Sequence, residues 1–115
     1  MINYVLDNFC IDLSMVWALG CSNGGMFMYE LAQDSRTHNL LAGVAPMVGL
    51  PHYGYNFGPA SPMSYIGFWG INDPTVPPKA NPASDGSYLP ERSSEQSGWF
   101  YQTADSTTAK WGELL

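Results

Sequence analysis

Cysteine, basic residues and long apolar runs are all scarce in this sequence, and each scarcity excludes a class of protein. The 115 residues hold two cysteines, no C-x-x-C pattern and no dense carboxylate or histidine cluster. Neither a disulfide framework nor a metal site is therefore expected. The net charge of −6 argues against nucleic acid or an anionic membrane surface as a partner. No apolar run reaches the roughly 18 residues of a membrane-spanning helix, so none is predicted.

One glycine-rich segment, Gly-Cys-Ser-Asn-Gly-Gly at 20–25, contains the pattern G-x-S-x-G with its serine at Ser22. The apolar residues 15–19 before it predict a buried strand, and residues 24–35 after it predict a helix. A strand, a tight turn and a helix in this order are typical of a nucleophile elbow. Strained backbone at such a turn holds the serine hydroxyl clear of the fold.

The elbow interpretation makes specific demands on its neighbours. Gly20 and Gly24 are both expected to be small because the chain passes close to itself there. The backbone N–H of Asn23, at the start of the helix, would be an oxyanion donor. The alternative is an ordinary glycine-rich helix N-terminus, with Ser22 or Asn23 as the capping residue. Cys21 is expected to point into the core, and a bridge to Cys10 is not expected because a strand separates them.

The remaining elements predict an α/β fold built of three adjacent parallel strands with flanking helices. Helices are expected at 2–8 and 102–115, and two further buried strands at 40–48 and 63–70. Because the strands are almost continuously apolar, the sheet should be covered on both faces. The central helix should bury a stripe of Phe27, Leu31 and Ala32. Residues 78–98, rich in Pro, Ser and Gly, predict a long surface loop or lid.

Two further candidate features follow the second and third predicted strands. Asp73 follows the third strand, so it should lie at the same rim of the sheet as Ser22 and could orient an imidazole. The alternative for Asp73 is a turn residue before a proline. An aromatic loop at 51–58 follows the second strand. Its side chains, with a later tryptophan, should line a substrate pocket or else pack under the long loop: His52, Tyr53, Tyr55 and Trp99.

Residues 9–12, 20–26 and 68–77, with 98–101 and 109–111, resemble one group of α/β-hydrolase esterases. This group includes polyhydroxybutyrate depolymerases, feruloyl esterases and acetylxylan esterases. The resemblance implies a partial α/β-hydrolase fold and a secreted serine carboxylic ester hydrolase that needs no cofactor. Ser22 would be its nucleophile, Asp73 its acidic triad residue, and an ester of a polyester or a plant polysaccharide its substrate.

The sequence also departs from that family. Its triad order is Ser, Asp, His, but the two histidines present, His38 and His52, both precede Asp73. The early strands with their glycine-rich oxyanion loop are missing as well. Residues 1–115 are therefore expected to be the central to C-terminal part of one catalytic domain, lacking the early strands and the histidine loop. We favour pocket lining for His52 over a role as base. The alternative function is an inactive fragment or a binding module without a triad histidine.

Overall fold

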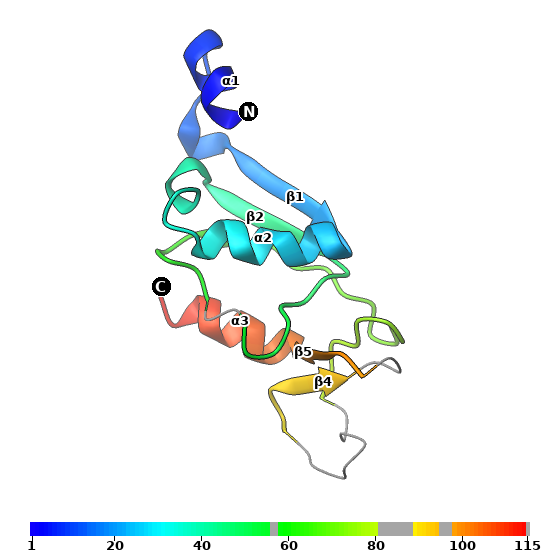
Figure 1. Cartoon of the computed structure of the whole chain (residues 1–115). Helices are drawn as coiled ribbons and strands as arrows, with labels where there is room; N and C mark the ends of the chain where they lie inside the picture. Colours follow the sequence, from blue (N-terminus) through cyan, green and yellow to red (C-terminus); the bar gives the residue numbers. More distant parts are fainter. Residues whose placement is uncertain (56–57, 81–88, 95–97, 115) are drawn as a thin grey trace.

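A three-stranded parallel sheet forms the centre of the structure (Figure 1). The structure is a computed structural model, and the residues that it describes are 1–55, 58–80, 89–94 and 98–114. The strands, in spatial order, are β1 (Trp17–Cys21), β2 (Gly43–Met47) and β3 (Ser64–Tyr65). Leu19 is paired with Ala45, and Val44 with Tyr65, in parallel register. The predicted set of adjacent parallel strands is therefore confirmed.

Helices precede, connect and follow these strands. They are α1 (Ile2–Asn8), α2 (Asn23–Gln33) and α3 (Ala104–Gly112), with 3-10 turns at Leu13–Met15 and His38–Leu40. Thr103 caps α3, because its side chain accepts a hydrogen bond of 3.1 Å from the Ser106 amide. Figure 1 shows α1 projecting beyond one end of the sheet and α2 lying along β1 and β2. The predicted mixed α/β class is confirmed.

A second, two-stranded antiparallel sheet lies beside α3. It consists of β4 (Arg92–Ser94) and β5 (Phe100–Gln102). Ser93 pairs with Tyr101 in this sheet. The expectation of a long loop over 78–98 is therefore wrong for β4, although residues 81–88 and 95–97 of that range lie outside the described residues.

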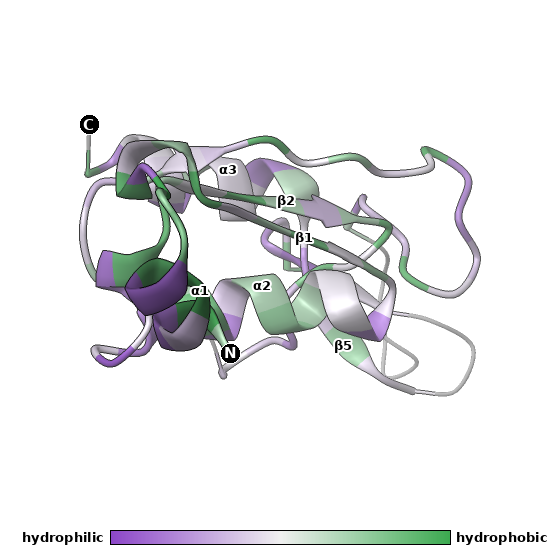
Figure 2. Ribbon diagram, turned by 90° about the horizontal axis from the view of Figure 1, so that it is seen from above, coloured by the Kyte–Doolittle hydropathy of each residue, from purple (hydrophilic) through white to green (hydrophobic). Residues whose placement is uncertain are grey.

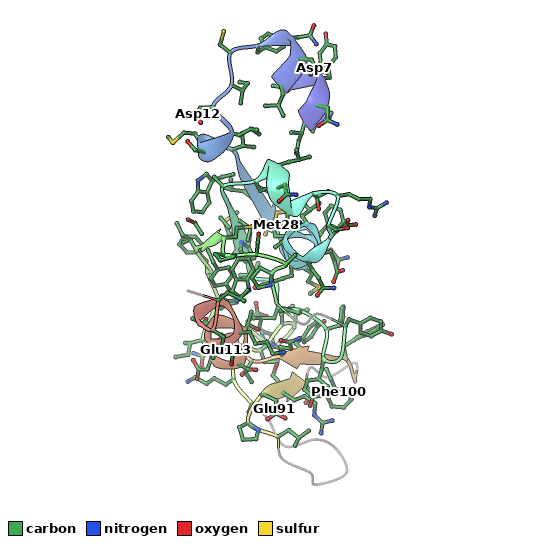
Figure 3. The ribbon with its side chains drawn as sticks, turned by 90° about the vertical axis from the view of Figure 1, so that its left-hand side faces the viewer. Asp7, Asp12, Met28, Glu91, Phe100 and Glu113 are labelled. Carbon is green, nitrogen blue, oxygen red and sulfur yellow. The ribbon has the colours of Figure 1, made fainter. Side chains whose placement is uncertain are left out.

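The core lies between α2 and the sheet, and Figure 3 shows Met28 within it. Met28, Tyr29 and Ala32 are buried, which places them on the face of α2 that meets Val44 of β2. The predicted burial of Ala32 is confirmed, and Leu31 packs against the cluster. The burial of Phe27 was a wrong expectation, since 57 % of its surface is exposed. Its position on the helix turns it away from the sheet.

The other face of the sheet carries apolar side chains that the described part of the chain leaves exposed. Figure 2 shows α2 along one face of β1 and β2. Ala18 and Val44 pack with the buried residues of α2 on that face, and side chains alternate along a strand. Leu19 on the opposite side is 65 % exposed, and Phe68, beyond β3, is 54 % exposed. The expectation of a sheet covered on both faces is therefore wrong for the residues that the structure describes.

Candidate functional site

Ser22 occupies a sharp turn between β1 and α2. Its φ of 54° and ψ of −121° lie where residues with a side chain are strained. The turn is fixed from both sides: the Ser22 amide donates to Met47 O at 2.9 Å, and the Met26 amide donates to Ser22 O at 2.9 Å. Ser22 is exposed, and although it is the N-cap residue of α2, its side chain makes no capping hydrogen bond. Capping therefore does not account for this serine.

The glycines around Ser22 differ in how far the turn requires them. A Cβ on Gly20 would overlap the carbonyl group of Gly24 and lie 2.9 Å from the Gly25 nitrogen. A Cβ on Gly25 would lie 2.8 Å from Met47 O. A Cβ on Gly24 would meet nothing within 4 Å. The requirement predicted for Gly20 is present, the one predicted for Gly24 is not, and Gly25 is the second glycine that the packing needs.

The two residues beside Ser22 lie on different structural elements. Asn23 is the first residue of α2 and is exposed, so its amide is at the positive end of the helix. Cys21 ends β1 and is an exposed free thiol, as is Cys10. The expectation of a buried Cys21 was wrong, because strand alternation places it with Leu19 on the face away from α2.

A cavity of about 380 Å³ opens at Ser22. The side chains that line it come from widely separated parts of the chain: Ser22, Asn23, Met26, His52, Thr75, Val76, Trp99 and Tyr101. Of the predicted site residues, Ser22, Asn23, His52 and Trp99 are thus brought together. Sequence reasoning missed Thr75 and Val76 as lining residues, although their place just after Asp73 was a usable signal. A larger cavity of about 630 Å³, between β3 and α3, contains no predicted site residue.

Asp73 builds the turn that brings Thr75 and Val76 to this cavity. Its Oδ1 atom accepts hydrogen bonds from the Thr75 amide at 2.8 Å and the Val76 amide at 3.0 Å. Both bonds end on Oδ1, and Oδ2 accepts no hydrogen bond from the part of the chain that the structure describes. Asp73 itself does not line the cavity, but it lies two residues before Thr75, which does. It has the turn-forming role that was the alternative.

His52 is held by aromatic rings at the same cavity. Its ring centroid lies 5.1 Å from that of Trp99 and 4.9 Å from that of Tyr101. Its Nδ1 is buried without a hydrogen-bond partner among the described residues. A triad histidine has a carboxylate on that nitrogen, so His52 lacks the partner that would orient it as a base. His38 is further from that role, because its Nδ1 lies 3.0 Å from Ser61 Oγ.

The two tyrosines of the aromatic loop, Tyr53 and Tyr55, lie in different surroundings. Tyr55 lines a neighbouring cavity of about 300 Å³ that shares Asn23, Met26 and His52 with the first. Tyr53 lines neither cavity, because its hydroxyl donates to Glu91 at 3.3 Å and its ring faces Arg92 at 5.8 Å. The structure therefore places Tyr53 apart from the other predicted pocket residues.

No group of three or more His, Cys, Asp or Glu side chains within the described ranges could hold a metal ion. None of the described helices has the length and apolar character to cross a membrane. Comparisons with protein-family models, with curated proteins and with solved structures find no significant match.

Proposed function

We propose that this chain supplies the nucleophile of a serine carboxylic ester hydrolase of the α/β-hydrolase type. The observation that carries the proposal is the strained, exposed and uncapped Ser22 beside a cavity. Holding a residue with a side chain in such a conformation costs about 1–3 kcal/mol. The fold gains no capping bond from this serine, so its hydroxyl is left for chemistry.

The proposed reaction runs through an acyl-enzyme. Ser22 Oγ attacks the carbonyl carbon of an ester while a base takes its proton. The Asn23 amide donates a hydrogen bond to the oxyanion of the tetrahedral intermediate. The alcohol leaves with a proton from the base, and water then hydrolyses the acyl-enzyme.

Asp73 would orient the imidazole that serves as the base. Its Oδ1 is occupied by two backbone amides, so Oδ2 would accept the Nδ1–H of a histidine. Since neither His38 nor His52 has that contact, the proposal places this histidine outside the 115 residues.

The walls of the Ser22 cavity favour a substrate with apolar or ring-shaped groups. Met26, Val76 and Trp99 supply apolar surface, and Tyr55 lies in the adjoining cavity. We therefore propose that the substrate is an ester of a polyester or of a plant polysaccharide, and that the enzyme acts outside the cell.

One observation supports a second candidate function. The turn role of Asp73 accounts for its two hydrogen bonds without catalysis. A chain in which Asp73 only forms a turn, and Ser22 has no base, would be an inactive binding module or fragment.

Fluorophosphonate labelling of the full-length protein tests the esterase proposal. The probe should modify Ser22, and Ser22→Ala should abolish labelling, whereas Ser35→Ala at another exposed serine should not. Asp73→Asn keeps an Oδ1 acceptor for the two amides, so the turn should persist while the labelling rate falls on the order of 10⁴-fold. Absence of labelling at Ser22 would overturn the proposal and favour the binding module.

A further inference from the structure

A second strained residue lies directly beside Ser22. Val48 has a φ of 44°, and among the described non-glycine residues only Ser22 shares a positive φ. A β-branched residue rarely adopts this conformation. Val48 follows β2, whose last residue, Met47, accepts the Ser22 amide at 2.9 Å. The two strained turns are thus linked through one hydrogen bond.

The chain after Val48 packs against the carbonyl of Ser22. A Cβ on Gly49 would lie 2.6 Å from Ser22 O and 2.8 Å from the Met26 nitrogen. These two atoms form the first hydrogen bond of the turn into α2. No side chain fits at Gly49, so its backbone packs directly against the backbone of the turn at Ser22. Leu50, fully buried, anchors the segment beyond it.

Tyr29 holds Gly49 in this place. It lies seven residues after Ser22 on α2, which is two turns along the same side of the helix. Its side chain is 1 % exposed, and its hydroxyl donates to Gly49 O at 3.1 Å. The Tyr65 hydroxyl lies 3.2 Å from that of Tyr29, and it donates there because the Tyr29 proton goes to Gly49. A tyrosine hydroxyl keeps its proton at neutral pH, and burial raises the pKa of Tyr29 further, to about 12.

We propose that Tyr29 is a positioning residue for Ser22: its hydroxyl fixes the Gly49 carbonyl, and Gly49 braces the elbow. This proposal rests on the proposed function, since it assigns Tyr29 to the same site. Without the hydroxyl, the buried Gly49 carbonyl has no donor among the described residues. The strained Val48 turn then loses one of the contacts that hold it against Ser22, while the bond of 2.8 Å from the Val48 amide to Phe68 O remains.

Amide hydrogen exchange tests the brace without any assay of activity. Tyr29→Phe should speed exchange at the amides of Ser22 and Met26 by roughly tenfold relative to the Ile66 amide, which bonds Val44 O in the sheet. Tyr65→Phe removes the other hydroxyl of the same pair but leaves the bond to Gly49, so it should not change that ratio. A merely structural Tyr29 would speed all these amides together, and that result would overturn the proposal.

Labelling kinetics add the functional readout in the full-length protein. Tyr29→Phe should lower the maximal rate of fluorophosphonate labelling about tenfold without changing the probe concentration for half-maximal rate, and Tyr65→Phe should change neither. Equal labelling by both variants would overturn the positioning role while leaving the esterase proposal intact. An unlabelled natural protein would overturn the esterase proposal, and the exchange ratio would still decide the brace. If Tyr29→Phe does not fold, the Tyr29 hydroxyl supports the whole fold and not the elbow alone, and the positioning role is overturned.

Discussion

The close packing of the turn at Ser22 predicts opposite effects on stability for replacing Gly20 and Gly24 by alanine. These glycines lie two residues before and two residues after Ser22. In Gly20→Ala, the added methyl group would overlap the carbonyl of Gly24, which belongs to the backbone and cannot rotate away. In Gly24→Ala, the methyl group would meet open space. Both positions carry the glycine of the G-x-S-x-G pattern, so the pattern alone expects them to behave alike.

The magnitudes follow from overpacking and helix propensity. Gly20→Ala should lower the free energy of unfolding by about 3 kcal/mol or more, because β1 and α2 must separate by about 1 Å. That loss corresponds to a Tm roughly 10 °C lower for a domain of this size. Gly24→Ala lies in the first turn of α2 and should raise the free energy of unfolding by about 0.5–1 kcal/mol.

Urea unfolding followed by circular dichroism measures both variants against the natural chain. Gly112→Ala is a further control, because its Cβ would also meet nothing within 4 Å. Similar losses for Gly20→Ala and Gly24→Ala would refute the packing argument. A loss confined to Gly24→Ala would show that the close approach is drawn at the wrong residue.

Three further predictions concern stability. The pKa of Tyr29 is raised by burial from near 10 to about 12, so the folded chain holds this proton more tightly than the unfolded chain. This stabilisation is complete below pH 10 and is lost toward pH 12, by about 1.4 kcal/mol per pH unit. Between pH 9 and 11, the free energy of unfolding in urea should fall less in Tyr29→Phe than in the natural chain, whereas the exposed Tyr55→Phe should fall as much as the natural chain. Equal falls in the two variants would contradict the prediction. Thr107→Val should stabilise by about 1 kcal/mol, because the buried Thr107 hydroxyl has no partner among the described residues, whereas Thr108→Val loses a 2.8 Å bond to a backbone carbonyl and should not stabilise. Asp73→Ala should cost about 1–3 kcal/mol and Asp73→Asn clearly less, because only the latter keeps an acceptor for two amides; equal losses in thermal unfolding would count against the turn geometry.

The sheet and the elbow could be predicted because their signals are local. Strands β1 and β2 are short apolar runs, and Gly20 marks the close approach of strand and helix, although the second glycine that the packing needs is Gly25 and not the predicted Gly24. The buried stripe of α2 was harder, because residues 26–29 are all apolar and periodicity cannot choose between adjacent faces. The burial of Met28 and Tyr29 in place of Phe27 is therefore decided only by packing against Val44.

The parts of the site that escaped prediction depend on contacts between distant residues. His52 is placed by its antiparallel pairing with Tyr101, and Tyr53 by a hydrogen bond of 2.9 Å from its backbone amide to Phe100 O. These partners are almost fifty residues away, and no spacing in the sequence records them. Strand β4 is likewise formed by polar residues, and it exists because β5 supplies its partner.

The backbone conformation of Ser22 makes the stability of the fold and the proposed reactivity compete at one position. A glycine would adopt a φ of 54° without steric cost, so Ser22→Gly should relax the turn while deleting the hydroxyl. Among replacements of Ser22, the one that relieves the most backbone strain therefore also removes the proposed nucleophile. Selection for a sturdier protein alone would therefore remove this serine.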